Sequence, residues 1–265
     1  MPLSCLALWF SCFAFASLAA ESPPRWNPPI PPGSAKNLVP NSSFELGSDG
    51  WSSLGTVTAG GGDLCGLYGV IQAGDAYDGG HCLRIELGPG KTPVTHSDYT
   101  LGASRTVTQA APLAASLGWM NVEAGQTYSI SAYMRADREG VPADLVFRFG
   151  GEVNTGFGSD THAKRVALTR DWTRYEFSMA ASAPDVFVAL GPNLSETPEA
   201  SATVWVDAVQ LEAVEPSDYV PREPVEVGIN SGHYGNLFDC DDPMGFTVCG
   251  TNTNETRANI EIHAQ

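Results

Sequence analysis

Three side chains on the polar faces of two alternating segments are the best candidates for binding a ligand. Tyr133 and Arg135 alternate with apolar residues in one segment, and Arg148 lies opposite aromatic residues in the next. A tyrosine ring can lie against the apolar C–H face of a sugar, and a guanidinium donates hydrogen bonds in a fixed fork. If the two segments are neighbours in one sheet, these residues form one carbohydrate-binding patch. The alternative is an ordinary solvated face.

Residues for catalysis form no recognisable set. The 30 acidic residues supply chance candidates such as Glu152 and Asp160, but nothing singles out the carboxyl pair that glycoside hydrolysis needs. The motifs G-x-S-x-G, H-E-x-x-H and the P-loop are absent, and the five histidines have no partner motif. We therefore expect no enzymatic activity in these residues.

The charge of the chain limits its partners. A formal net charge of -16 disfavours nucleic acid and anionic membrane surfaces, because no basic patch could offset the repulsion. A neutral poly- or oligosaccharide is compatible with this charge, and so is Ca²⁺. An arginine pair would favour uronic acid or sulfate groups, but the overall charge repels them, so neutral glucan-like or xylan-like chains are the first choice.

The N-terminus is typical of a secreted protein. Residues 1–20 carry no charge, and an apolar run from Leu6 to Phe15 precedes small residues that fit a signal-peptidase site. The run is too short to span a bilayer. No Lys or Arg precedes it, and the alternative is a buried N-terminal helix. We predict a signal peptide and a secreted, extracellular, periplasmic or cell-surface location without membrane insertion.

Four cysteines remain after the predicted signal peptide. An even number in a secreted chain predicts disulfides, and local pairing joins Cys65 to Cys82 and Cys240 to Cys249 without crossing domains. A zinc site is the alternative, but no C-x-x-C pair and no suitably spaced histidine supports it.

Period-two alternation predicts strands separated by Gly and Pro turns. We expect them at residues 83–87, 128–135, 145–149, 174–179, 185–190 and 203–212. No segment shows a sustained helical period, so the fold class is all-β, a β-sandwich spanning residues 37–222. Residues 21–36 hold six prolines and predict an extended linker.

The sequence pattern of residues 223–265 predicts a separate β segment. Residues 225–229, 245–249 and 258–262 alternate as strands, so residues 223–265 are predicted to begin a second small β domain of a longer protein. The alternative is a short appendage packed on the first domain.

Several segments resemble one known group of modules. Those that carry the resemblance are residues 37–47, Gly50-Trp51, 119–128, 168–177 and 204–212. Together they resemble the jelly-roll carbohydrate-binding modules, the galactose-binding-like group that includes families four, nine and twenty-two. The resemblance implies a jelly-roll sandwich with a sugar-binding surface. It also implies that Trp51, Trp172 and Trp205 serve mainly in packing.

A structural calcium site is a further implication of the resemblance. In such modules a first-strand glutamate and a last-strand aspartate help to hold Ca²⁺, and the matching positions here are Glu45 and Asp207. Calcium takes six to eight oxygen ligands, so carbonyl groups would complete the shell. The alternative is a pair of solvated surface carboxylates.

We therefore expect a secreted, monomeric, calcium-stabilised module that binds carbohydrate without catalysis. It would deliver an attached glycoside hydrolase, or another extracellular protein, to a polysaccharide. Two alternatives stay open: the N-terminal part of a hydrolase whose catalytic domain follows residue 265, and a cell-surface spacer that binds no sugar.

Overall fold

The protein is described here from a computed structural model. It covers residues 36–54, 64–90, 95–98, 103–106, 110–117, 119–150, 160–213, 215–230 and 245–253. The predicted signal peptide, nearly all of the predicted linker and the predicted strand 258–262 lie outside these residues. Within the described ranges every regular element is a β-strand, as the sequence predicts. No helix there has the length and apolar character that crossing a membrane requires.

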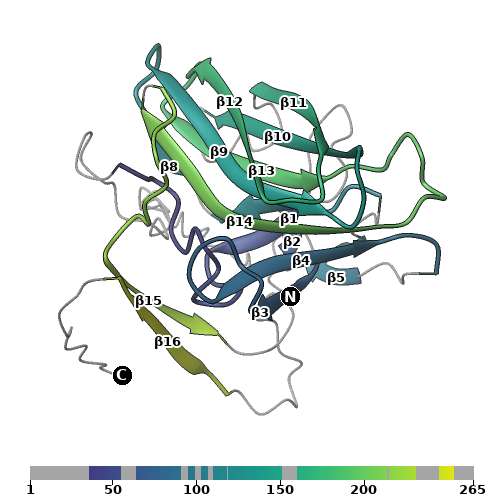
Figure 1. The fold of residues 1–265 in the computed structure, drawn as a ribbon. Coiled ribbons are helices and arrows are strands. Elements are labelled where there is room, and N and C mark those ends of the chain that lie inside the picture. The colour runs from purple at the N-terminus through teal and green to yellow at the C-terminus, as the bar shows by residue number, and fades with distance from the viewer. Residues whose placement is uncertain are drawn as a thin grey trace, which may run out of the picture.

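Two antiparallel sheets pack face to face as a jelly-roll β-sandwich (Figure 1). The larger sheet has seven strands: β1 (Trp51–Leu54), β2 (Leu64–Gly66), β7 (Leu113–Ser116), β8 (Met120–Asn121), β10 (Val141–Gly150), β11 (Asp160–Leu168) and β13 (Asp185–Pro192). Its order is β11-β10-β13-β7-β1-β2, and β8 pairs with β13. The pairings of β10 with β13, β13 with β7 and β7 with β1 join strands far apart in the chain.

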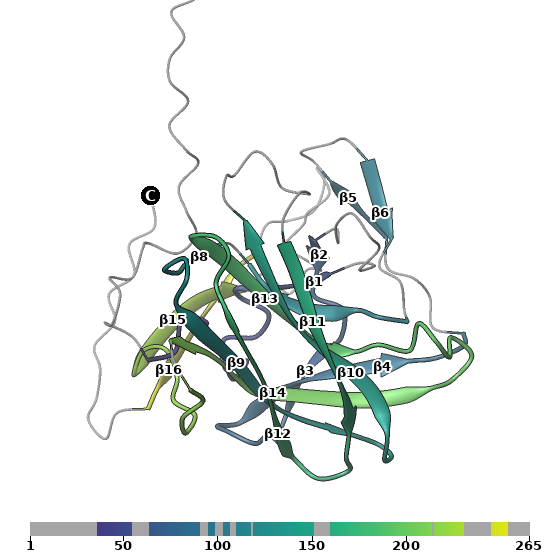
Figure 2. The same ribbon diagram turned by 90° about the horizontal axis from the view of Figure 1, so that it is seen from above.

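The five-stranded sheet has the order β12-β9-β14-β4-β3. Its strands are β3 (Val70–Ala73), β4 (His81–Leu87), β9 (Thr127–Ala136), β12 (Thr173–Ala180) and β14 (Ala202–Ala213). All six strands predicted for the sandwich are present in the two sheets. A separate hairpin of β5 (Thr95–Asp98) and β6 (Ala103–Thr106) pairs with no strand of either sheet (Figure 2).

The core lies between the sheets and follows the predicted alternation. On β9 the inward residues are Tyr128, Ile130, Ala132 and Met134, and all are buried. Leu145, Phe147 and Phe149 face them from β10. A smaller apolar cluster on the outer face of the larger sheet contains Leu113, Ala115, Val146, Phe187 and Ala189. Burial of these side chains, each worth about 1.5–3 kcal/mol, fixes which face of each strand points outward.

The first sequence motif forms turns rather than a strand, and it lies against the end of β14. The Leu38 amide donates to the Leu211 carbonyl at 2.8 Å, and the Val209 amide donates to the Ser42 carbonyl at 2.8 Å. Asn41 organises the turn, since its side-chain nitrogen donates to two nearby carbonyl groups. The two ends of the sandwich domain therefore meet.

A second hairpin follows the sandwich, made of β15 (Val225–Asn230) and β16 (Thr247–Asn252) (Figure 1). The second strand begins two residues later than the sequence predicts. Glu226 on β15 accepts a hydrogen bond from the Asn41 amide at 3.3 Å, so the hairpin contacts the first turn of the sandwich. Whether it begins a second domain stays a prediction.

No disulfide is present among the cysteines that the structure describes. Cys82 and Cys249 are free thiols, and Cys240 lies outside the described residues. Cys65 lies on β2 of the larger sheet, whereas Cys82 lies on β4 of the smaller one and alternates with the inward Leu83. Because Leu83 points into the core, Cys82 points away from the larger sheet and does not face β2 across the sandwich. Burial is the main cause that raises the pKa of the Cys82 thiol to about 11.

Candidate functional site

The outer face of the five-stranded sheet carries most of the candidate chemistry. Tyr133 and Arg135 point outward from β9 because the residues between them point into the core. On the adjacent strand β14, Asp207 lies opposite Tyr133 and Trp205 lies opposite Arg135. Two of the three predicted sugar-binding residues are thus brought together on one surface.

Arg135 lies between two indole rings. Its guanidinium carbon is 4.3 Å from the ring centroid of Trp205 and 5.1 Å from that of Trp172, which precedes β12. The same guanidinium forms an ion pair with Asp75 in the β3–β4 turn. Cation–π contacts of this kind hold aromatic rings and a cation in a fixed arrangement. The two tryptophans are therefore parts of the outer surface.

A stacked tyrosine pair stands beside this group. The rings of Tyr77 and Tyr133 lie 3.4 Å apart, centroid to centroid, with an interplanar angle of 11°. Trp172 meets Tyr77 edge-on at 6.5 Å. A side-chain hydrogen bond with Tyr133, followed by desolvation, raises the pKa of Tyr77 to about 12. Tyr77 is 45% exposed, so its ring is accessible at the surface.

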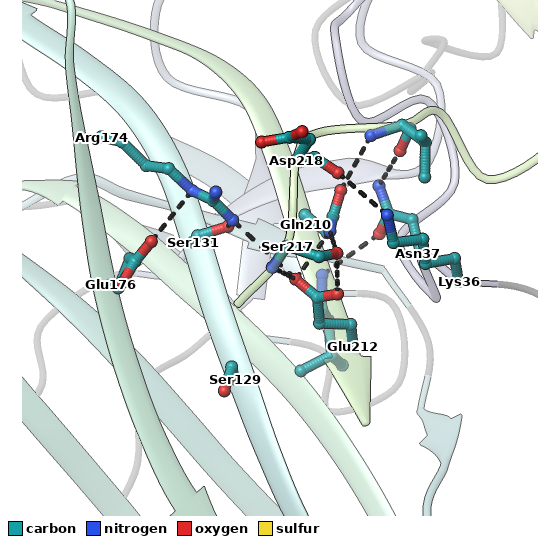
Figure 3. Close-up of polar contacts among 12 residues, drawn as sticks. Lys36, Asn37, Ser129, Ser131, Arg174, Glu176, Gln210, Glu212, Ser217 and Asp218 are labelled. Carbon is teal, nitrogen blue, oxygen red and sulfur yellow. Dashed lines mark hydrogen bonds and ion pairs between the residues drawn. The ribbon is translucent and has the colours of Figure 1, made fainter. Parts of the chain in front are cut away.

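A polar network continues along the same face (Figure 3). Arg174 on β12 donates to the Ser131 hydroxyl at 2.9 Å, and its nitrogens lie 3.2 Å from Glu176 and 3.8 Å from Glu212. Ser131 and Glu212 are almost fully buried although they face outward. Arg174 is thus held between two carboxylates, and the exposed one, Glu176, can accept hydrogen bonds from a ligand.

The loop after β14 closes this end of the face. Glu212 accepts hydrogen bonds from the Gln210 amide at 2.7 Å and the Ser217 backbone amide at 2.8 Å. Gln210 in turn accepts from the Val220 amide at 2.9 Å. Figure 3 shows that Asn37 lies beside this network. These satisfied polar groups give the surface a rigid edge.

Asp207, one of the two predicted calcium ligands, holds the β3–β4 turn. Its Oδ2 accepts from the Tyr77 amide at 2.7 Å and the Asp78 amide at 3.0 Å. Its Oδ1 accepts from the adjacent Ala208 amide at 2.7 Å, where a β-bulge interrupts β14. Asp207 therefore fixes the backbone of the residue whose ring stacks on Tyr133.

Glu45, the other predicted calcium ligand, holds the far end of the same turn. Its Oε1 accepts from the Gly80 amide at 2.7 Å and the His81 amide at 2.8 Å, and its Oε2 lies 2.9 Å from Nδ1 of His81. A Cβ at Gly79, which has φ +64°, would collide with this carboxylate. Glycine at that position allows the close approach.

These contacts do not fit a calcium site as they stand. A carboxylate offers about four lone-pair positions, and amide hydrogens or an imidazole occupy three of them on each of Glu45 and Asp207. Among the described side chains, no group of three or more His, Cys, Asp or Glu gathers to hold a metal. Calcium therefore stays a prediction, and the observed role of both residues is to accept hydrogen bonds from the turn.

The third predicted sugar-binding residue, Arg148, does not join the patch. β9 and β10 follow each other in the chain but belong to different sheets, so their outer faces lie on opposite sides of the sandwich. Arg148 is buried, with its guanidinium carbon 5.5 Å from the ring centroid of Phe187. The single three-residue patch considered from the sequence is therefore not formed.

Sequence reasoning also missed three aromatic residues of this surface. Trp205 was expected in the core, yet it alternates with the buried Val204 and Val206, and that alternation places it outside. Trp172 lies before β12, where no strand period applies. Tyr77 lies in a glycine-rich turn, and no sequence signal points to its stacking on Tyr133.

No known protein family and no curated protein matches the sequence. Solved structures similar to the chain include carbohydrate-binding modules. A family 61 module in complex with β-1,4-galactotriose has 12% identity, covering 68% of this chain and all (100%) of that one, with a TM-score of 0.41. A family 16 module has 14% identity, with 68% of this chain and 100% of that chain covered, and a TM-score of 0.41. A family 22 xylan-binding domain from Paenibacillus barcinonensis has 19% identity, with 66% of this chain and 94% of that chain covered, and a TM-score of 0.38.

Proposed function

We propose that the protein binds carbohydrate without catalysis on the outer face of its five-stranded sheet. The observation that carries this proposal is the exposed Tyr77 ring stacked on Tyr133, with two indoles beside it. Sugar rings stack on such aromatic surfaces, while a few polar groups fix their orientation. Asp75 and Glu176 supply exposed acceptors for hydroxyl groups on this surface.

The charge of this surface favours a neutral glycan. Arg135 is paired with Asp75, and Arg174 is paired with both Glu176 and Glu212. Each guanidinium therefore already has a carboxylate partner, and an acidic sugar would have to displace it. The net charge of -16 adds long-range repulsion against uronic acid and sulfate groups.

The arrangement of Arg174 supports a non-catalytic role. Glycoside hydrolysis uses two carboxyl groups on either side of the scissile bond. Here two of the carboxylates of this face, Glu176 and Glu212, both interact with one guanidinium, which lies between them, and a third, Asp75, is paired with Arg135. The proposed role is that of a secreted module, stabilised by calcium or by its own hydrogen bonds, that brings an attached hydrolase or other extracellular protein to a polysaccharide.

The test is binding to a glycan panel by the full chain and by matched variants. Pull-down on insoluble polysaccharides comes first, followed by calorimetry with soluble neutral oligosaccharides. Tyr77→Ala, Tyr133→Ala and Trp172→Ala should each weaken binding by about tenfold, the equivalent of about 1.4 kcal/mol. Phe246→Ala removes an exposed aromatic residue next to β16 and serves as the control, because it should leave the affinity unchanged.

The outcomes separate the proposed function from its alternatives. Folded protein that binds no glycan in a broad panel supports the spacer interpretation. Binding that survives all three aromatic substitutions moves the site away from this face. Preference for polygalacturonate or sulfated glycans over neutral chains contradicts the assigned ligand class.

A further inference from the structure

Two carboxylates from opposite ends of the sandwich domain hold one short turn. The turn between β3 and β4 spans residues 74–80 and contains Tyr77, and His81 is the first residue of β4. Asp207 on the last strand accepts the amide hydrogens of Tyr77 and Asp78, and Glu45 in the first turn accepts those of Gly80 and His81. Four amides within five residues thus point at two carboxylates.

Unusual backbone conformations gather at the same place. The non-glycine residues with positive φ include Phe44 at 60°, Asp75 at 58° and Ala208 at 48°. Phe44 lies in the first turn, Asp75 lies in the β3–β4 turn, and Ala208 lies in the bulge that presents Asp207. Left-handed conformations of non-glycine residues cost about 1–3 kcal/mol and persist where the surrounding contacts impose them, commonly at ligand clamps.

The held turn carries the exposed ring of the proposed binding surface. Asp207 binds the amide of Tyr77 itself, at 2.7 Å, so it limits the rotation of the backbone that aims this ring at Tyr133. Turn residues that are free to move would have to be ordered when a ligand binds, which weakens affinity.

We infer that Glu45 and Asp207 are positioning residues that pre-organise Tyr77 for carbohydrate binding by accepting hydrogen bonds from its turn. This inference rests on the proposed function of the same surface. It assigns the two residues a role through amide hydrogens, different from the metal coordination that the sequence resemblance implies.

The experiment compares two substitutions of Glu45 in the full chain. Glu45→Ala removes the acceptor, whereas Glu45→Gln keeps one oxygen that can accept both the Gly80 and the His81 amide. Well below the melting temperature, Glu45→Ala should weaken glycan affinity about tenfold and Glu45→Gln should retain most of it. Leu190→Ala, in the core, is the control for general destabilisation and should leave the affinity unchanged.

A double-mutant cycle tests whether Glu45 acts through Tyr77. If it does, Glu45→Ala should cause no further loss of affinity in a Tyr77→Ala background, because coupled residues are not additive. Nuclear Overhauser contacts between the rings of Tyr77 and Tyr133 should weaken in Glu45→Ala and persist in Glu45→Gln. A purely structural role would give additive losses and unchanged ring contacts.

The results distinguish this inference from the proposed function. If Tyr77→Ala weakens glycan binding about tenfold but Glu45→Ala does not, the positioning role is wrong and the binding surface stands. If the wild type binds no glycan, the proposed function fails, and the positioning role fails with it. If EDTA weakens affinity as strongly as Glu45→Ala and Ca²⁺ restores it, a metal ion holds the turn and the inference is overturned.

Discussion

Asp207 should make the stability of this protein depend on pH in a direction unusual for an aspartate. Its side chain is fully buried, and desolvation raises its pKa from the ordinary 3.8 to about 7, although three backbone hydrogen bonds oppose the rise. The negative charge of Asp78 raises the pKa further. In the unfolded chain the carboxyl group returns to its ordinary pKa.

The sign follows from counting protons. Between about pH 4 and pH 7 the folded protein keeps a proton on Asp207 that the unfolded chain has lost, so the free energy of unfolding falls as pH rises. The contribution of the protonated Asp207 to the free energy of unfolding is fully present below about pH 4 and is lost above about pH 7. A rise from 3.8 to about 7 corresponds to about 4 kcal/mol in total.

Urea unfolding between about pH 4 and pH 8, in the presence of EDTA, measures this dependence. The asparagine in Asp207→Asn cannot ionise. The free energy of unfolding of this variant should therefore vary less between about pH 4 and pH 8 than that of the wild type, and the difference should approach about 4 kcal/mol. Asp49 and Glu226 also have pKa values raised by burial, but they are present in both proteins and cancel, whereas the electrostatic interaction of Asp78 with Asp207 is part of the difference measured. Parallel pH profiles for wild type and Asp207→Asn would refute the reasoning.

Three further predictions concern other parts of the structure. If Ca²⁺ binds Glu45 and Asp207, EDTA should lower the melting temperature of the wild type but not of Asp207→Ala; a melting curve indifferent to EDTA counts against the metal. Gly150→Ala places a Cβ 2.7 Å from the Trp119 ring and should destabilise by about 1–3 kcal/mol in urea unfolding, whereas Gly245→Ala, with open space around it, should be neutral. Alkylation of the native protein should label the half-buried Cys249 and spare the buried Cys82 until denaturant is added, and mass spectrometry that finds Cys82 disulfide-linked would contradict this.

Strand faces could be predicted from the sequence because burial imposes period two. The alternation in β9 correctly separated the inward Ile130 and Met134 from the outward Tyr133 and Arg135. The sheet to which each strand belongs could not be predicted in this way. The chain crosses from one sheet to the other between β9 and β10, so Arg148 has the predicted alternation but lies on the far side of the sandwich.

Other differences between the sequence-based expectations and the structure also depend on contacts between distant residues. The cysteine count is a property of composition, whereas a disulfide needs two side chains that face each other, and Cys82 points away from the sheet that contains β2. For Glu45 and Asp207, the sequence pairs two carboxylates but does not show the amide hydrogens of the β3–β4 turn that reach them first. Tyr77 becomes part of the site only through that turn.

The meeting of the two ends of the sandwich makes the domain a transferable unit. The Asn37 side chain donates to the Val220 carbonyl at 3.0 Å, so the chain enters and leaves the domain at one point. A domain whose ends are adjacent can be inserted into a surface loop of a host protein, or circularly permuted, with little strain. Splicing residues 37–222 into such a loop would leave the Tyr77 and Trp172 side chains, which lie over β9 on the outer face of the five-stranded sheet, available for binding.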